Sequence, residues 1–221
     1  ACRRCYASLF TDRAIVYRRN HGFDHMKIAL SVGVQHMVRA EKAGAGVMFS
    51  IDTETGFPRT VLVNAAWGLG ETVVQGTVDP DEYQVFKPLL GDPRLKPIVG
   101  KKLGGKARKM TSKLVATSKA ERAAFVLADD EVLQLARWAC AIAAHYGQPL
   151  DMEWAKDGET GELFIVQARP ETVQSRKAAG ILRAFRLEKP GRRLVSGLAI
   201  GESIGAGKVC HAGGKAIALF R

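Results

Sequence analysis

Four polar side chains in one short stretch could bind a metal ion and a polyphosphate together. Asp151 and Glu153 lie two residues apart, and so do Gln167 and Arg169. Apolar and aromatic residues flank them, and glycines with aspartate and threonine stand in the middle, so the stretch predicts two strands around a turn. Side chains two residues apart share one face of a strand. We therefore expect a pair of carboxylates on one arm and an amide with a guanidinium on the other.

The register of this predicted hairpin decides whether the two pairs meet. If Lys156 pairs near Glu162, Asp151 lies opposite Gln167, and all four polar groups converge on one surface. The alternative is an ordinary surface hairpin, because oppositely charged residues are common across neighbouring strands.

Two carboxylates, a carboxamide and a guanidinium on one patch suit a divalent cation that holds a polyphosphate. Mg²⁺ prefers oxygen ligands and usually binds through one or two carboxylates together with substrate phosphates. Arginine offers planar donors to phosphate oxygens. The pattern therefore predicts a site for magnesium and a polyphosphate.

The same stretch resembles a known family. An acidic pair followed by Gln-Ala-Arg-Pro-Glu is similar to the metal- and ATP-binding end of the ATP-grasp domain in the phosphoenolpyruvate synthases, and pyruvate phosphate dikinases and rifampicin phosphotransferases share it. Several matches in order, over roughly the first four-fifths of the chain, are far more specific than any one of them. The other matching segments are Ala7–Ala14, Gly46–Ser50, Gly68–Glu71, Val78–Tyr83 and Phe86–Pro88.

The resemblance gives each of the four polar side chains a role. In this family the equivalent positions bind Mg²⁺ and the nucleotide phosphates. We therefore expect Glu153 and Gln167 to face the metal. Asp151 is expected to support them, and Arg169 to contact the phosphates.

A second segment resembles the part of related ATP-grasp domains that binds the base. There a Gln-x-Met-Val segment forms the hinge between two lobes, its backbone pairs with adenine, and its apolar side chains cover the ring. Gln35, Met37 and Val38 match this pattern, and His36 occupies the variable position. The alternative is the end of a core strand in which methionine fills space.

The turn Gly68–Glu71 is a weaker candidate. A short glycine-rich turn lets backbone amides approach a phosphate closely. The turn has neither the Walker pattern nor the dinucleotide-binding pattern of glycines. We expect it at most to shape the wall of a cleft.

The resemblance implies an α+β fold and a phosphotransferase function. The fold would be the C-terminal lobe of an ATP-grasp domain, a mostly antiparallel sheet with helices. The function would be to bind ATP and Mg²⁺ for an enzyme that converts pyruvate, ATP and water to phosphoenolpyruvate, AMP and phosphate through a phosphohistidine. The alternative within the same class is another dikinase or a rifampicin phosphotransferase-like enzyme. Ser8–Ala14 and Asp79–Tyr83 favour the synthases.

The resemblance also divides the chain. Residues 1–175 would be the ATP-grasp domain, incomplete at its N-terminus, 176–192 a linker, and 193–221 the start of a swivelling phosphohistidine domain. We therefore expect a piece of a longer protein that has no turnover by itself. His211 lacks the Gly-Gly-Arg-Thr that precedes the phosphorylated histidine of the family, so that histidine is expected beyond Arg221.

Composition is that of a globular protein, with 47% hydrophobic and 25% charged residues. No apolar run is long enough to cross a membrane, so we expect no membrane partner. The cysteines show no disulfide framework, which fits the cytoplasm. The resemblance further implies that the full-length protein is a homo-oligomer.

A net charge of +11 raises the alternative of a basic module that binds nucleic acid. The basic residues cluster on what reads as a hairpin around Gly104 and Gly105, and no aromatic residues for stacking on bases lie among them. We therefore expect a solvated face and no nucleic-acid partner. The cluster consists of Lys101, Lys102, Lys106, Arg108, Lys109 and Lys113.

Hydrophobic periodicity predicts the elements that carry these residues. The clearest helical region is 121–146. Its main helix is expected to be capped by Asp129 or Asp130 and to be followed by Gly147. A second region, 8–23, is helical or mixed. Strands are expected at 28–34, 45–51, 60–67, 82–87 and 97–103, and the hairpin at 150–169 closes the unit.

Overall fold

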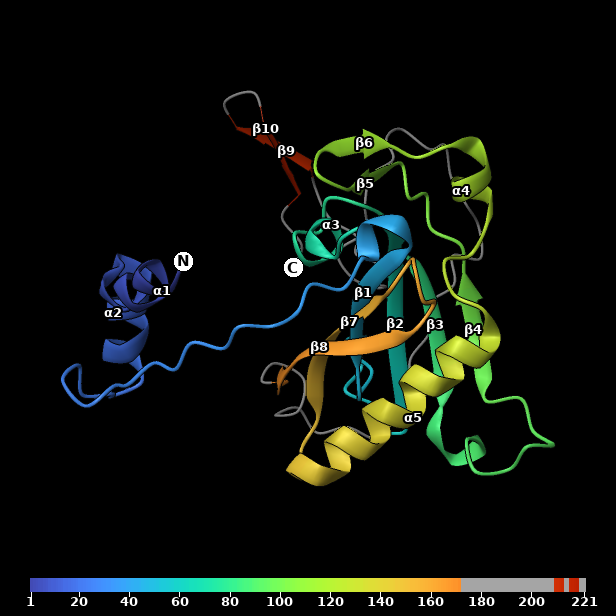
Figure 1. The fold of residues 1–221 in the computed structure, drawn as a ribbon, viewed down its shortest axis with the longest axis horizontal. Helices are drawn as coiled ribbons and strands as arrows, with labels where there is room; N and C mark the ends of the chain where they lie inside the picture. The colour runs from blue at the N-terminus through green and yellow to red at the C-terminus, as the bar shows by residue number, and fades with distance from the viewer. Residues whose placement is uncertain (172–208, 213–214, 219–221) are drawn as a thin grey trace. The chain divides into compact units, whose positions relative to one another are not determined.

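The computed structural model describes residues 1–171, 209–212 and 215–218 (Figure 1). It divides the chain into two units, Ala1–Met37 and Val38–Arg221. The linker expected at 176–192 lies outside the described residues. So does most of the swivelling domain expected at 193–221, of which the antiparallel strands β9 (Val209–Ala212) and β10 (Lys215–Ala218) are described.

The first unit begins with helices, and they include most of the region 8–23 that was predicted to be helical or mixed. It contains α1 (Cys2–Ala7), η1 (Ser8–Phe10) and α2 (Asp12–Asn20). Arg18 is buried and holds this unit together, because its Nη2 donates to Leu9 O at 2.7 Å and its Nε to His25 Nδ1 at 2.9 Å.

The strand expected at 28–34 is wrong. The described residues of this segment form no strand, and Val34 is 90% exposed. Alternating apolar residues predict a buried face, but a strand also needs a neighbour with which its backbone can form hydrogen bonds. No partner strand pairs with this segment within the described part of the chain.

A six-stranded sheet forms the second unit, in the order β4-β3-β2-β1-β7-β8. Every neighbouring pair is antiparallel, which confirms the predicted α+β fold with a mostly antiparallel sheet. The strands are β1 (Gly44–Phe49), β2 (Thr60–Trp67), β3 (Asp81–Phe86), β4 (Ile98–Lys102), β7 (Leu150–Lys156) and β8 (Leu163–Pro170). The shorter elements are η2 (Ala40–Lys42), α3 (Glu71–Val74), η3 (Lys87–Leu89), α4 (Lys119–Ala123) and the small hairpin of β5 (Arg108–Met110) and β6 (Leu114–Ala116).

Helix α5 (Asp129–Tyr146) covers one face of this sheet (Figure 1). The predicted helix is confirmed, and Gly147 ends it in the left-handed conformation at φ 67°. The predicted cap is off by one or two residues. Ala128 precedes the first turn, and its backbone N–H donates to the carboxylate of Glu131 at 2.9 Å. Ala128 has no polar side chain to accept from the N–H groups of the first turn, as a capping aspartate would, so only the Glu131 half of a capping box is present.

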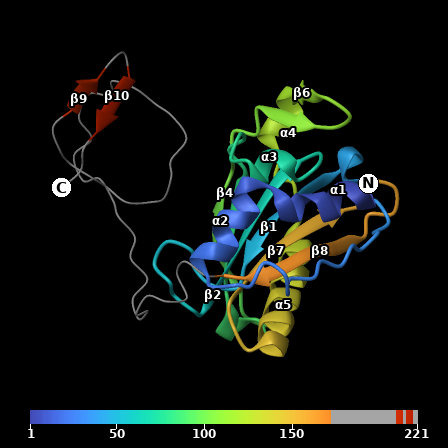
Figure 2. The same cartoon turned by 90° about the vertical axis from the view of Figure 1, so that its left-hand side faces the viewer.

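The main core lies between α5 and the sheet. Strand side chains alternate between faces, so one set on each strand points to the helix. The strand side chains of this set are fully or almost fully buried, and they include Met48, Val63, Tyr83, Met152 and Trp154. The helix side chains that pack against them are Val132, Leu135, Ala136 and Ala139. In Figure 2, β7 and β8 lie next to each other, with α5 against the sheet. The alternate set of side chains points to the opposite face, which we call the open face.

Leu135 tests this packing. Leu135→Ala should lower the free energy of unfolding by about 2–5 kcal/mol, because it removes a fully buried side chain and leaves a cavity. Urea denaturation followed by circular dichroism measures the change. Gln134→Ala, on the exposed side of the same helix, should change it by less than about 0.5 kcal/mol. Equal effects of the two substitutions would contradict the assignment.

Candidate functional site

The hairpin of β7 and β8 brings the four predicted polar side chains together, but in another register. Asp151 lies opposite Arg169, and Glu153 lies opposite Gln167. Lys156 pairs with Leu163 and not with Glu162, so the expected pairing of Asp151 with Gln167 is wrong. Residues that lie opposite each other on antiparallel strands point to the same face. All four side chains therefore lie on the open face, as the sequence predicted.

A β-bulge in β8 makes this arrangement possible. Near the turn Trp154 pairs with Ile165, but beyond it Glu153 pairs with Gln167, so Val166 is an extra residue. Without that residue the alternation along β8 would place Gln167 opposite Met152, on the face that packs against α5. The bulge thus lets Ile165 join the core while Gln167 reaches the open face.

Asp151 and Arg169 form a close ion pair. Arg169 Nε donates to Asp151 Oδ2 at 2.8 Å, and Nη2 lies 2.8 Å from the same oxygen. The Arg169 side chain is 56% exposed, whereas that of Asp151 is only 15% exposed. Asp151 therefore fixes the orientation of the guanidinium, and Nη1 remains for another acceptor. The other carboxylate oxygen, Asp151 Oδ1, is buried without a hydrogen-bond partner among the described residues.

A pocket of about 590 Å³ lies on the open face. It extends from Asp151 and Arg169, on β7 and β8, to Glu82 and Lys102, on β3 and β4. Val47 also lines it and pairs with Glu153 on the neighbouring strand. The two residues expected to face the metal, Glu153 and its partner Gln167, thus lie beside the pocket.

The glycine-rich turn does not itself line this pocket, but it leads into the helix that does. Gly68 has φ 83°, and Leu69 N–H donates to Met110 O at 2.8 Å, so the turn is fastened to β5. The short helix α3 follows, and its residues Val73 and Val74 line the pocket. The turn acts on the pocket through the position of α3.

The segment predicted to bind adenine spans the boundary between the two units. Gln35, His36 and Met37 end the first unit, in an extended stretch, and Val38 begins the second. Val38 packs with Leu69 and Val166 against a cluster of small buried alanines. That cluster consists of Ala40, Ala45 and Ala155.

The turn of the hairpin holds the chain just after Val38. Arg39 N–H donates to Asp157 Oδ2 at 3.1 Å, and Gly158 N–H donates to Arg39 O at 3.2 Å. The Arg39 guanidinium and Lys42 both pair with Glu159. The hairpin that carries Glu153 and Gln167 is thereby tied to Arg39 and Lys42.

The basic cluster is only in part the solvated face that the sequence predicted. Lys101, Lys106 and Lys109 are each paired with a carboxylate, and Lys106 is completely buried against Asp81. Lys102, Arg108 and Lys113 are exposed, as expected. Sequence reasoning missed Asp81, although it is in phase with Tyr83 and Val85 on the buried face of β3.

The donor set on the open face suits a hard cation only when a ligand supplies further oxygens. In the described part of the chain, no three His, Cys, Asp or Glu side chains come together as a metal site. A carboxylate with an amide oxygen beside it matches Mg²⁺, which keeps waters and takes substrate phosphates as ligands. Asp151 Oδ1, which is buried and has no hydrogen-bond partner among the described residues, is a further acceptor on this hairpin.

None of the helices described between residues 1 and 171 has both the length and the apolar character needed to cross a membrane.

Comparisons with known proteins show the family to which the chain is similar. The family described as pyruvate phosphate dikinase, AMP/ATP-binding domain, matches residues 1–189. The chain is 55% identical over 222 residues to the phosphoenolpyruvate synthase of Synechocystis sp., covering 94% of this chain and 27% of that protein. The synthases of Pseudomonas aeruginosa and Helicobacter pylori are 52% and 51% identical, over 95% and 94% of this chain. The chain spans 27–28% of the length of these three relatives.

Asp157 gives a pH-dependent test of the hairpin turn. The backbone N–H groups of Glu159 and Arg39 lower the pKa of Asp157 below its ordinary 3.8. The ionised form is thus favoured in the folded state, so its stabilising effect is complete above the unfolded pKa and is lost as pH falls through the folded pKa. Asp157→Asn should lose less stability than the unmodified chain between about pH 5 and pH 2, by urea denaturation. Identical acid dependence would contradict this role.

Proposed function

This chain belongs to the pyruvate phosphate dikinase AMP/ATP-binding domain family, and from that premise we propose that its open face binds ATP together with Mg²⁺. The observation that carries the proposal is the cross-strand pair of Glu153 and Gln167, beside the ion pair of Asp151 and Arg169. These groups provide the oxygen ligands and the phosphate donor that a metal–nucleotide complex needs.

We propose that Glu153 and Gln167 hold Mg²⁺ through a carboxylate and an amide oxygen. The buried Asp151 Oδ1 supports this, because it is an acceptor that a cation or its bound water would satisfy. Bound there, the metal neutralises charge on the polyphosphate and orients it. Few protein ligands suffice, because Mg²⁺ takes its remaining ligands from phosphate and water.

Arg169 is proposed to contact the phosphates through the N–H groups that Asp151 does not use. Its guanidinium lines the pocket and is held in place by a hydrogen bond from Nε and an ion-pair contact of Nη2, both with one oxygen of Asp151. A guanidinium that is already oriented loses less conformational entropy when it binds a phosphate. Asp151 thus supports the site indirectly, by positioning Arg169.

Gln35, His36, Met37 and Val38 are proposed to form the adenine contacts. The support is that Val38 joins an apolar cluster with Leu69, which lies in the glycine-rich turn Gly68–Glu71. Apolar side chains suit the flat face of a base. The hydrogen bonds of Arg39 to the hairpin turn fix the chain directly after Val38.

The reaction of the whole relatives is a further proposal. The chain would provide the ATP-binding portion for the conversion of pyruvate, ATP and water to phosphoenolpyruvate, AMP and phosphate, and would have no turnover by itself. The support is the identity to three phosphoenolpyruvate synthases over a quarter of their length. Pyruvate as substrate, a homo-oligomeric full-length protein and a cytoplasmic location are proposed on the same ground.

Glu153→Gln tests the metal role, because its effect on the affinity for ATP should differ with and without Mg²⁺. With Mg²⁺ present the variant should bind ATP at least about tenfold more weakly, because a charged ligand to the metal is lost. With EDTA it should bind ATP as well as the unmodified chain or better, because a carboxylate that repels phosphate is gone. Isothermal titration calorimetry under both conditions measures the two constants.

Glu162→Gln is the matched control, because Glu162 is exposed in the turn of the same hairpin. It should leave both constants unchanged. Equal weakening of ATP binding by Glu153→Gln with and without Mg²⁺ would argue for a structural effect and against the metal role.

A further inference from the structure

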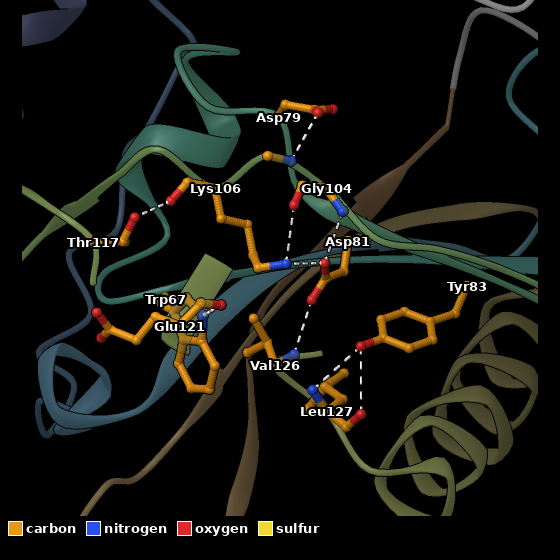
Figure 3. Close-up of polar contacts among 11 residues, drawn as sticks. Trp67, Asp79, Asp81, Tyr83, Gly104, Lys106, Thr117, Glu121, Val126 and Leu127 are labelled. Carbon is orange, nitrogen blue, oxygen red and sulfur yellow. Dashed lines mark hydrogen bonds and ion pairs between the residues drawn. The ribbon is translucent and has the colours of Figure 1, made fainter. Parts of the chain in front are cut away.

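A completely buried ion pair lies behind the pocket wall, between β3 and the turn after β4 (Figure 3). The side chains of Asp81 and Lys106 are both 0% exposed, and Lys106 Nζ contacts Asp81 Oδ1. The same oxygen accepts from Gly104 N–H at 2.9 Å, and Asp81 Oδ2 accepts from Val126 N–H at 2.8 Å. Lys106 Nζ also donates to Gly104 O at 3.1 Å.

Stability alone is a poor reason for such a pair. Removing two charges from water costs more free energy than their attraction usually returns, and apolar residues of similar size often stabilise a core better. The pair does, however, make three further hydrogen bonds, two with Gly104 and one with Val126. Buried pairs of this kind are best known for fixing a register or an arrangement.

The backbone around the pair is held in an unusual conformation. Lys106 has φ 39°, and it is the one residue other than glycine with positive φ in the described chain. Its N–H donates to Asp79 O at 3.0 Å, and Thr117 Oγ1 donates to its carbonyl. Gly104 lies so close to Pro80 that any Cβ there would collide with the Pro80 carbonyl. Strain of this kind persists only where surrounding contacts impose it.

The register between β3 and β4 changes just beside this pair. At the far end Val85 pairs with Ile98, whereas at the near end Glu82 pairs with Lys102. The shift between Gln84 and Val85 means that the apolar pairing does not by itself set the register near the pocket. An unshifted ladder would place Lys101 opposite Glu82 and turn it to the open face.

Lys101 and Lys102 lie on opposite faces of the sheet. In the structure Lys102 lines the pocket on the open face. Lys101 points to the other face, where it pairs with Asp129 at 2.6 Å and lies 4.4 Å from the ring centre of Phe125. Asp81 accepts from Gly104, two residues after Lys102, and so holds β4 in the shifted register.

We propose that Asp81 and Lys106 are positioning residues for the pocket, and that their ion pair selects Lys102 and not Lys101 as the β4 cation facing it. The pair acts through the register of β4 and touches no ligand. What the pocket binds rests on the function proposed above, whereas the choice between the two lysines does not.

The test uses the 221-residue chain with Asp81→Asn, Lys106→Met and the double variant. Nuclear Overhauser effects between backbone protons of Glu82 and those of Lys102 or Lys101 report the register directly. The variants should lose the contacts between Glu82 and Lys102, and keep those between Val85 and Ile98. The dissociation constant for ATP with Mg²⁺ should rise, by up to about a hundredfold, because one wall of the pocket is displaced.

The double variant separates positioning from stability. It leaves no lone buried charge, so it should resist urea better than either single variant, yet its register and its ATP affinity should remain impaired. Lys101→Met is the matched control: it loses the pair with Asp129 and should leave both the register and the affinity unchanged.

The outcomes are decisive. Preserved contacts between Glu82 and Lys102 in the double variant would overturn the proposal, whatever the ATP affinity. If the unmodified chain does not bind ATP, the proposed function fails, and the backbone contacts alone then decide the positioning role. If a single variant does not fold, the double variant supplies both readouts.

Discussion

One extra residue in β8 decides whether this protein has a site at all. Val166 shifts the alternation of the strand, so that Leu163 and Ile165 before it pack into the core, whereas Gln167 and Arg169 after it turn to the open face. Gln167 and Arg169 thereby join Glu153 and Asp151 on one surface. A bulge sacrifices regular pairing at one position, and here that loss places four polar groups where a metal and a polyphosphate can reach them.

The opposite edge of the pocket is arranged in the same way. Between Gln84 and Val85 the pairing of β3 with β4 shifts, and beyond the shift Lys102 faces the open side. The sheet must satisfy two demands, since one face packs against α5 and the other binds a polar ligand. Regular alternation meets both demands only if the apolar side chains of every strand point to α5 and the polar side chains point to the open face. Two local irregularities correct the phase at the two edges, and a buried ion pair fixes one of them.

The sequence predicts the elements well and the register poorly. Strands 60–67 and 97–103 and the main helix of the region 121–146 have strong periodicity and apolar residues that find partners, so the structure confirms them. Residues 124–128 of that region are not helical. The pairing of Lys156 could not be predicted, because turn geometry and a bulge set it, and neither leaves a clear mark in composition. The expected convergence of four side chains is correct because the bulge compensates for the different turn register.

Two further errors have physical causes. Periodicity predicted a strand at 28–34, but periodicity says nothing of a partner strand. Lys106 was grouped with solvated lysines because a run of basic residues usually is a solvated face. Its burial depends on Asp81, 25 residues earlier, and only the alternation of Asp81 with Tyr83 and Val85 hinted at that.

Paramagnetic broadening tests the central claim most directly. Mn²⁺ replaces Mg²⁺ in many sites and broadens nearby amide signals of a ¹⁵N-labelled chain. With ATP and Mn²⁺ together, the account predicts broadening at Glu153, Gln167 and Val47, and sharp signals in the acidic first turn of α5, at Asp129–Glu131. Broadening of that turn with sharp signals at Glu153 and Gln167 would contradict a metal–nucleotide site on the open face.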